Sequence, residues 1–244
     1  MIRTIEEYSL NAQPALQTLV YDGWLLRFAG GYAKRANSVH PLYPSTEPPL
    51  VKIKNCEQFY AAKNLSAVFK ITPAATPLTL DSLLAEQGYR RNSPSSVQLL
   101  DLAEFTPCPD DHLTATQHLT EDWLNDFCRF SSITNRNRPV LSYMLKNIIP
   151  NKYIVSLKAG NTAIGGGVGV LQDEFIGLYD IVIDGAYRNQ GYGKKLLSGL
   201  LRLGSAAGAK KAYLQVMTNN FPAVRLYSSL GFKEIYQYWY RSLN

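Results

Sequence analysis

Residues 175–206 read FIGLYDIVIDGAYRNQGYGKKLLSGLLRLGSA, and they give the clearest local pattern in the chain. Residues 175–183 are apolar, rich in β-branched and aromatic side chains, and too few for a typical helix, so they predict a strand. From Tyr192 onward the apolar residues recur with helical spacing, at positions 192, 196, 197, 200 and 203. A short polar link joins the two segments. The predicted order is therefore strand, loop, helix.

The loop in this stretch has the chemistry of an anion-binding site. Gly191 and Gly193 stand where the helix begins, and a glycine lets a ligand approach the backbone closely. The first N–H groups of a helix lack partners within it, and the helix dipole favours negative charge there. Arg188, Lys194 and Lys195 add positive charge. We therefore expect a phosphate or pyrophosphate at this point.

Two common nucleotide motifs do not fit the loop. A dinucleotide fingerprint needs GxGxxG and a P-loop needs GxxxxGK followed by Ser or Thr, and neither occurs here. The remaining pattern, RNQGYG over 188–193, resembles the (R/Q)xxGxG pyrophosphate loop of the GNAT superfamily of N-acetyltransferases.

A second pattern follows at the expected distance. Residues 220–232, NFPAVRLYSSLGF, resemble the GNAT signature NxxAxxLYxxxGF. Asn220 and Pro222 suit the start of a helix, and Gly231 suits its end. Tyr227 stands at the signature's tyrosine, although a plain core tyrosine is the structural alternative.

The resemblance implies an α/β protein with the GNAT fold, a mixed and mostly antiparallel sheet flanked by helices. The strand 175–183 is expected to splay from the strand 211–216 and admit the pantetheine arm of acetyl-CoA. The expected cofactor-binding residues are Ile181, Val182, Ile183, Arg188, Asn189, Gln190, Gly191, Tyr192, Gly193, Lys194, Asn220 and Tyr227. Tyr227 is further expected to protonate the leaving CoA thiolate, as the family's tyrosine does.

The resemblance does not identify the residue that acts as the general base. Some family members use a glutamate on the central strand, but the roughly matching position here is Gly177. Asp180 ranks first as the catalytic base and Glu174 lies nearby in sequence. Asp180 also fits an acceptor-binding group or a buried structural carboxylate, and a water chain is a further alternative.

Two functions from different classes follow. The first is an N-acetyltransferase that moves an acetyl group from acetyl-CoA to a primary amine, of a small molecule or a protein, by direct attack. The second is a non-catalytic acyl-CoA-binding sensor or adaptor with the same fold. The retained tyrosine favours the enzyme, and transfer of another acyl group is a weaker third option.

Composition bounds these functions. The 244 residues carry a formal net charge of +6, which suits an anionic cofactor, and no dense Lys/Arg run suggests nucleic acid. The histidines and the three cysteines form no metal-ligand pattern, and the odd cysteine number favours a reduced, cytoplasmic setting. No stretch reads as a membrane span or signal peptide. A monomer or homodimer is expected.

The first half of the chain is expected to be a degenerate GNAT-like unit. LLAEQGYRRNSPSSVQLLDL resembles LYSSLGFKEIYQYWYRSL, since each predicts a helix, a glycine–aromatic pair and a strand, but the first half lacks RxxGxG. The predicted domains are 1–105 and 112–244, joined by a linker within 103–116. We also expect a short helix within residues 1–20 with Pro14 near its start, and a helix over 55–63. A polar return strand is expected over 32–39; either its residues Lys34, Arg35, Asn37 and Ser38 line a cleft, or it is a solvated edge strand.

Overall fold

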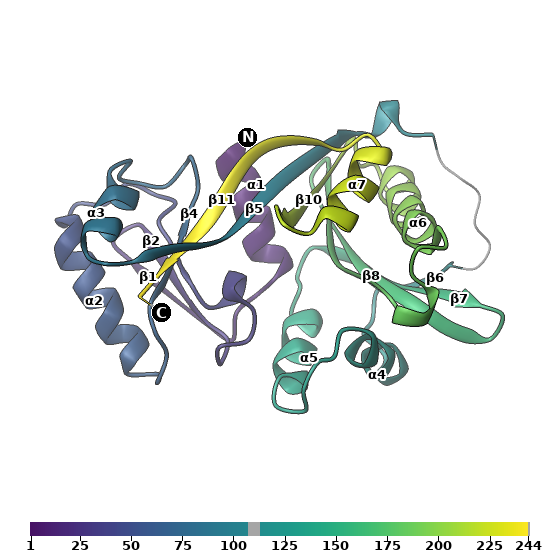
Figure 1. Ribbon diagram of the computed structural model, residues 1–244, viewed down its shortest axis with the longest axis horizontal. Helices are drawn as coiled ribbons and strands as arrows, with labels where there is room; N and C mark the ends of the chain where they lie inside the picture. Colours follow the sequence, from purple (N-terminus) through teal and green to yellow (C-terminus); the bar gives the residue numbers. More distant parts are fainter. Residues whose placement is uncertain (107–112, 244) are drawn as a thin grey trace. The chain divides into compact units, whose positions relative to one another are not determined.

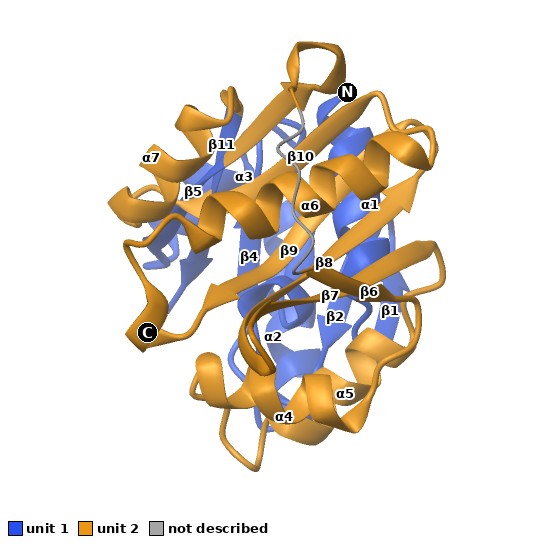
Figure 2. Ribbon diagram, turned by 90° about the vertical axis from the view of Figure 1, so that its right-hand side faces the viewer, with its two compact units in different colours: residues 1–96, 236–244 blue, residues 97–235 orange. Residues whose placement is uncertain are grey.

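The computed structural model describes residues 1–106 and 113–243. The chain divides into two compact units: unit 1 comprises residues 1–96 and 236–244, and unit 2 comprises residues 97–235 (Figure 2). This division differs from the predicted boundary because residues 236–244 at the C-terminus belong to unit 1. The predicted domains 1–105 and 112–244 stay a prediction, and residues 107–112 of the predicted linker lie outside the described residues.

Unit 1 is built on a sheet with strand order β1-β2-β3-β4-β11. These strands are β1 (Gln17–Tyr21), β2 (Trp24–Phe28), β3 (Val39–His40), β4 (Val68–Ile71) and β11 (Lys233–Ser242). Its helices are α1 (Ile2–Ala12), α2 (Pro49–Ala61) and α3 (Leu80–Glu86). Only the pair β3–β4 is parallel among the pairings recorded in the described part of this unit. Trp24, Tyr60 and Phe69 are fully buried at the centre of its core.

In unit 1 the bounds of two predicted helices were wrong, and one predicted strand does not form. Helix α1 ends at Ala12, before Pro14, because proline lacks the N–H that a continuing helix needs. Helix α2 begins six residues earlier than predicted, with Pro49 in its first turn, a position where proline's missing N–H costs nothing. The predicted return strand is a 3-10 helix, η1 (Lys34–Ala36), followed by the two residues of β3.

Asn37 explains why the return strand does not form. Its side-chain oxygen accepts hydrogen bonds from the N–H groups of Ala29 and Gly31, at 2.7 and 2.9 Å, and its amide donates to the carbonyls of Tyr32 and Ala33. A buried asparagine that holds four backbone groups of its own loop keeps that loop compact. Asn37 is therefore a structural residue here, and it was wrongly expected to line a cleft.

Unit 2 is built on a sheet with strand order β5-β10-β9-β8-β7-β6, where β5 and β11 each contribute residues to both units. The strands are β5 (Arg90–Asp101), β6 (Leu113–Thr116), β7 (Asn151–Ala159), β8 (Thr162–Gln172), β9 (Phe175–Ile183) and β10 (Lys211–Met217). The helices are α4 (Glu121–Phe130), α5 (Arg138–Lys146), α6 (Tyr192–Ala206) and α7 (Phe221–Ser229), with short 3-10 helices η2 (Leu102–Glu104) and η3 (Gly185–Tyr187). The pair β9–β10 is parallel, whereas β6–β7, β7–β8 and β8–β9 are antiparallel, which confirms the mixed, mostly antiparallel sheet.

Helices α6 and α4 cover opposite faces of this sheet (Figure 1). Glycines on β8 allow the close approach of both: a Cβ on Gly167 would meet Leu200 of α6 at 3.3 Å, and one on Gly166 would meet Trp123 of α4 at 3.2 Å. Leu196, Leu197, Leu200 and Leu201 of α6 are fully buried. Burial of each leucine contributes about 1.5–3 kcal/mol. These contacts hold α6 on the sheet and thereby fix the position of the loop before it.

Candidate active site

The loop before α6 is shaped by its own side chains. Asp184 caps η3 by accepting a hydrogen bond from the N–H of Ala186 at 3.0 Å. Arg188 Nε donates to the carbonyl of Ile183 at 3.1 Å, and Gln190 Nε2 donates to the carbonyl of Ala186 at 3.1 Å. These bonds fold residues 183–190 back on themselves, so the chain turns sharply between β9 and α6.

Two residues with left-handed backbone conformation follow in this loop. Asn189 has a φ of +60° and Gly191 a φ of +82°. Alternating left- and right-handed residues gather successive N–H groups on one side and form an anion-binding concavity. Within the described residues, no hydrogen bond engages the N–H groups of residues 189–193, whereas that of Lys194 already bonds to the carbonyl of Gly191 at 3.1 Å. The predicted loop thus offers a run of unpaired donors.

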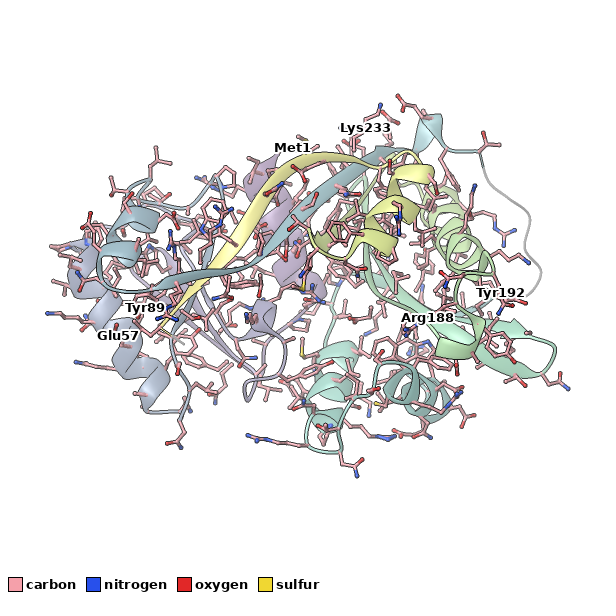
Figure 3. The ribbon with its side chains drawn as sticks, viewed as in Figure 1. Met1, Glu57, Tyr89, Arg188, Tyr192 and Lys233 are labelled. Atoms are coloured by element: carbon pink, nitrogen blue, oxygen red, sulfur yellow. The ribbon has the colours of Figure 1, made fainter. Side chains whose placement is uncertain are left out.

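The surroundings of these donors suit an anion. Gly191 has open space where a Cβ would lie, and Gly193 approaches Leu226 so closely that its Cβ would lie 3.0 Å away. Arg188 and Lys194 are exposed beside the loop, and Figure 3 labels Arg188 and Tyr192, which bracket it. Because backbone donors, a helix N-terminus and basic side chains meet here, the residues fit a pyrophosphate.

Strands β9 and β10 separate partway along their length. Their parallel pairing runs from Phe175 opposite Lys211 to Leu178 opposite Leu214 and stops there. On the other side, β9 stays paired with β8 as far as Ile183 opposite Gly165. The recorded pairing with β10 therefore ends before Ile181, Val182 and Ile183, which agrees with the predicted splay, and Val182 and Ile183 pair with β8 on their other side.

A β-bulge lies at the point of separation. Val168 pairs with Tyr179 and Gly166 with Val182, so Asp180 and Ile181 together oppose Gly167. Asp180 takes a left-handed φ of +53°, which is uncommon for a residue other than glycine. Bulges of this kind re-aim side chains, and this one sets the half-buried Asp180 two residues beyond the last recorded pair of β9 with β10.

Helix α7 carries the two other predicted residues. Asn220 caps the helix, with its side-chain oxygen accepting from the N–H of Ala223 at 3.3 Å. Tyr227 is 9% exposed and packs edge-on against Phe232. Burial raises the pKa of Tyr227 to about 12, so its phenol stays protonated throughout the physiological range.

The structure explains why no glutamate stands on the central strand. A Cβ on Gly177 would lie 2.6 Å from the ring of Tyr213 and 2.7 Å from that of Tyr179. The hydroxyls of these two tyrosines are 2.7 Å apart and hydrogen-bonded. Sequence reasoning missed this pair, and its one available signal was the glycine in a strand, which often marks a close approach.

A cavity in unit 2 lies apart from the predicted site residues. A cavity of about 510 Å³ is bordered by α4, β6 and β7, and none of the predicted site residues lines it. Among the described residues, no group of three or more His, Cys, Asp or Glu side chains is placed to hold a metal ion. No helix within residues 1–106 and 113–243 has the length and hydropathy of a membrane span.

Comparison with known proteins shows the family of the chain. Residues 1–241 match the family model described as "Probable histone acetyltransferase Rv0428c C-terminal". The chain is 28% identical to "Uncharacterized N-acetyltransferase YobR" of Bacillus subtilis over 98% of both chains. It is 40% identical to the [Ribosomal protein bS18]-alanine N-acetyltransferase of Haemophilus ducreyi over 24% of this chain and 40% of that one.

Solved structures show the same fold. A GCN5-related N-acetyltransferase from Kribbella flavida superposes with a TM-score of 0.72 at 14% identity, over 98% of this chain and 94% of that one. A tandem GNAT protein from the clavulanic acid biosynthesis pathway superposes with a TM-score of 0.61 at 11% identity, over 85% of this chain and 75% of that one. The GNAT fold predicted from the two signatures is therefore confirmed. The chain belongs to the GNAT N-acetyltransferases, in the family of the Rv0428c C-terminal part, and is an acetyltransferase.

Proposed function

We propose that this enzyme moves an acetyl group from acetyl-CoA to a primary amine by direct attack, without an acyl-enzyme. The observation that carries the proposal is the run of unpaired N–H groups at residues 189–193, which ends at the start of α6. The pyrophosphate of CoA fits these donors and the charges of Arg188 and Lys194. Asn189, Gln190, Gly191, Tyr192 and Gly193 contribute their backbone to the cradle.

The unpaired edge of β9 is the proposed seat of the pantetheine arm. Backbone groups of Ile181, Val182 and Ile183 would pair with its amides much as an added strand would. Acetyl-CoA supplies a thioester, which is reactive toward a neutral amine. An N–H of this segment would then stabilise the negative charge that develops on the thioester oxygen. Since the Asn220 side-chain oxygen is engaged in capping α7, its amide nitrogen is the atom left to reach the arm.

Asp180 is the proposed general base. A primary amine is mostly protonated at neutral pH and must lose a proton before it attacks. The bulge sets Asp180 at the point where β9 leaves β10, and the space over Gly177 is filled by Tyr179 and Tyr213. Asp180 is therefore the carboxylate on this strand that lies nearest the proposed reaction, and it would take the proton from the acceptor.

Tyr227 is the proposed acid at the departing sulfur. Its phenol holds its proton tightly, because burial raises the pKa of Tyr227 to about 12, whereas a thiol has a reference pKa of about 8.5. Complete transfer to a free thiolate would therefore be uphill by about 5 kcal/mol. We infer that Tyr227 acts mainly by donating a hydrogen bond to the sulfur as the bond to carbon breaks.

The acceptor is proposed only as a primary amine of a small molecule or a protein. The names of the similar proteins point to protein amines: an alanine of ribosomal protein bS18 for one relative, and histone for the family model. Both names describe proteins whose acceptor is an amine on a polypeptide. A screen of amines should therefore include a peptide α-amine, a lysine side chain and small polyamines.

We further propose that unit 1 is a degenerate GNAT-like unit without a CoA site. The two segments that resemble each other end their helices in the same way. Gly88 and Gly231 have φ values of +84° and +93°, and the following N–H groups, of Tyr89 and Phe232, bond back to the helix at 2.9 and 3.1 Å. The proposed anion-binding loop, with its RxxGxG sequence, lies in unit 2, and residues 1–96 contain no such sequence.

Replacement of Tyr227 by phenylalanine tests the proposed chemistry. The change removes one hydroxyl, keeps the ring, and is expected to lower kcat by about 10²-fold while CoA affinity stays near the wild-type value. Activity is measured as thiol release with the amine panel. Tyr153→Phe is the matched control, since Tyr153 packs against the same core but lies on β7.

Two results would contradict the role of Tyr227. An unfolded Tyr227→Phe protein would make the residue a core tyrosine. Wild-type turnover in a folded variant, with the chemical step shown to be rate-limiting, would make water the acid.

A further inference from the structure

Strand β1 is an unprotected edge of the sheet in unit 1. It stands first in the strand order, and its register with β2 runs without a bulge from Gln17 opposite Phe28 to Tyr21 opposite Trp24. Its residues, QTLVY, include no charge and no proline, and the first four are exposed. Natural edge strands are usually protected by charges, proline, bulges or a covering element. This edge has none of the first three.

Apolar side chains continue from the edge onto α2. A cavity of about 520 Å³ lies between β1 and α2 and is lined in part by Leu19, Phe28 and Phe59. Leu19 is 38% exposed, Val20 67% and Phe59 39%. Leu50 and Val51, on the same helix, are 45% and 47% exposed. An uncharged strand edge with an adjoining apolar groove is typical of a surface that another strand covers.

We propose that a second copy of this chain covers this edge, with β1 of one protomer antiparallel to β1 of its partner. A two-fold axis at Leu19 gives a self-complementary register: Gln17 opposite Tyr21, Thr18 opposite Val20, and Leu19 opposite its own counterpart. No like charges face each other in this register. The two α2 helices then lie on the same face of the joined sheet, where their exposed apolar side chains add to the buried area.

Charges at the two ends of the strand also match. Lys63 lines the groove beside Gln17, and Glu47 accepts a hydrogen bond from the Tyr21 hydroxyl at the other end. Because the two-fold axis sets the Gln17 end of one protomer against the Tyr21 end of its partner, Lys63 comes to the side of the partner's Glu47. This match favours a second copy over an unrelated extended peptide.

Sedimentation of three proteins tests the interface. The wild-type chain is expected to dimerise, and Leu19→Lys, which sets two lysines opposite each other, should raise the dimer dissociation constant by about 10-fold or more. Leu78→Lys is the matched control, because Leu78 is 86% exposed but lies outside this surface. Circular dichroism verifies that each variant is folded. A wild-type monomer at the highest soluble concentration, or a Leu19→Lys dimer of unchanged affinity, overturns the proposal.

Cross-linking tests the register without disturbing charge. In a background with Cys108 and Cys128 replaced by serine, Leu19→Cys is expected to form a reducible dimer, since paired residues in antiparallel strands lie within disulfide reach. Val20→Cys faces Thr18 of the partner and should cross-link about 10-fold more slowly. Equal rates for the two variants, or no cross-linked dimer from Leu19→Cys, would refute the two-fold pairing.

Discussion

Unit 1 and unit 2 use their polar groups in opposite ways. Unit 1 buries charges and satisfies them internally: Lys70 bonds to Glu6, and Arg27 donates to the carbonyls of Leu10 and Arg35. In unit 2 the described buried residues include no charged side chain, and the core is mostly leucine, isoleucine and valine. Its unpaired donors lie instead at the loop over 189–193.

This contrast between paired and unpaired polar groups indicates which unit can bind a ligand. Burial and the charges of Arg27 and Lys70 lower the pKa of His40 well below its usual value, so His40 stays neutral among cations that hold the fold of unit 1. The charged groups of unit 1 that pair internally, such as Lys70 with Glu6, have little left for a ligand. Unit 2 derives its stability from apolar burial, and its backbone donors remain available to an anion.

The largest expected effect comes from removing one buried charge in unit 1. Lys70→Met leaves Glu6, which is fully buried, without its cation, although the Tyr236 hydroxyl still donates to it. Breaking a buried pair costs about 3–5 kcal/mol. Lys233→Met, which breaks the exposed pair with Glu104, should change the free energy of unfolding by less than about 1 kcal/mol. Urea unfolding measures both. Equal small losses would show that the buried pair contributes no more than a surface one.

The next effect concerns the anion loop of unit 2. Wild-type protein should bind one CoA per chain, and Gly191→Asp should weaken binding about 100-fold, because it adds a side chain and a negative charge where phosphate would lie. Gly208→Asp is the matched control: Gly208 also has a positive φ and open space, but it follows the other end of α6. Calorimetric titration measures affinity and stoichiometry. Normal affinity in Gly191→Asp, or two CoA per chain, would contradict the assignment of one site to this loop.

The third effect is a loss of stability that grows with pH in the alkaline range. Burial raises the pKa of Tyr60, Tyr89 and Tyr240 in unit 1, so the folded unit keeps protons that the unfolded chain releases near pH 10. Stability from these groups is complete below pH 10 and falls as pH rises further, by about 1.4 kcal/mol per pH unit for each group. The urea midpoint, followed by tryptophan fluorescence, should therefore drop between pH 9 and 11. A constant midpoint would mean that these phenols ionise in the folded protein.

The site was more predictable from sequence than the fold of unit 1. Local sequence patterns predict Gly191, Tyr227 and Asn220, because a helix start and a helix cap depend on neighbouring residues. The pair Glu6–Lys70 joins residues 64 positions apart, and the fit of Tyr213 over Gly177 depends on strand register. Neither is visible in a local window. The loop held by Asn37 was misread as a strand for a different reason: its hydrogen bonds span only four to eight residues, but the residue types over 32–39 do not show that the Asn37 side chain bonds to its own loop.

Strand β11 gives the chain an unusual order of assembly. Unit 1 needs residues 236–242 to complete its sheet, yet its other residues end at 96, so residues 97–235 must be synthesised in between. At a ribosomal rate of 5–20 residues per second, that interval lasts roughly 7–28 s. During this interval β4 lacks its partner strand β11. Every residue of unit 2 is synthesised before unit 1 has its last strand. The half of the protein made earliest is the half that finishes folding last.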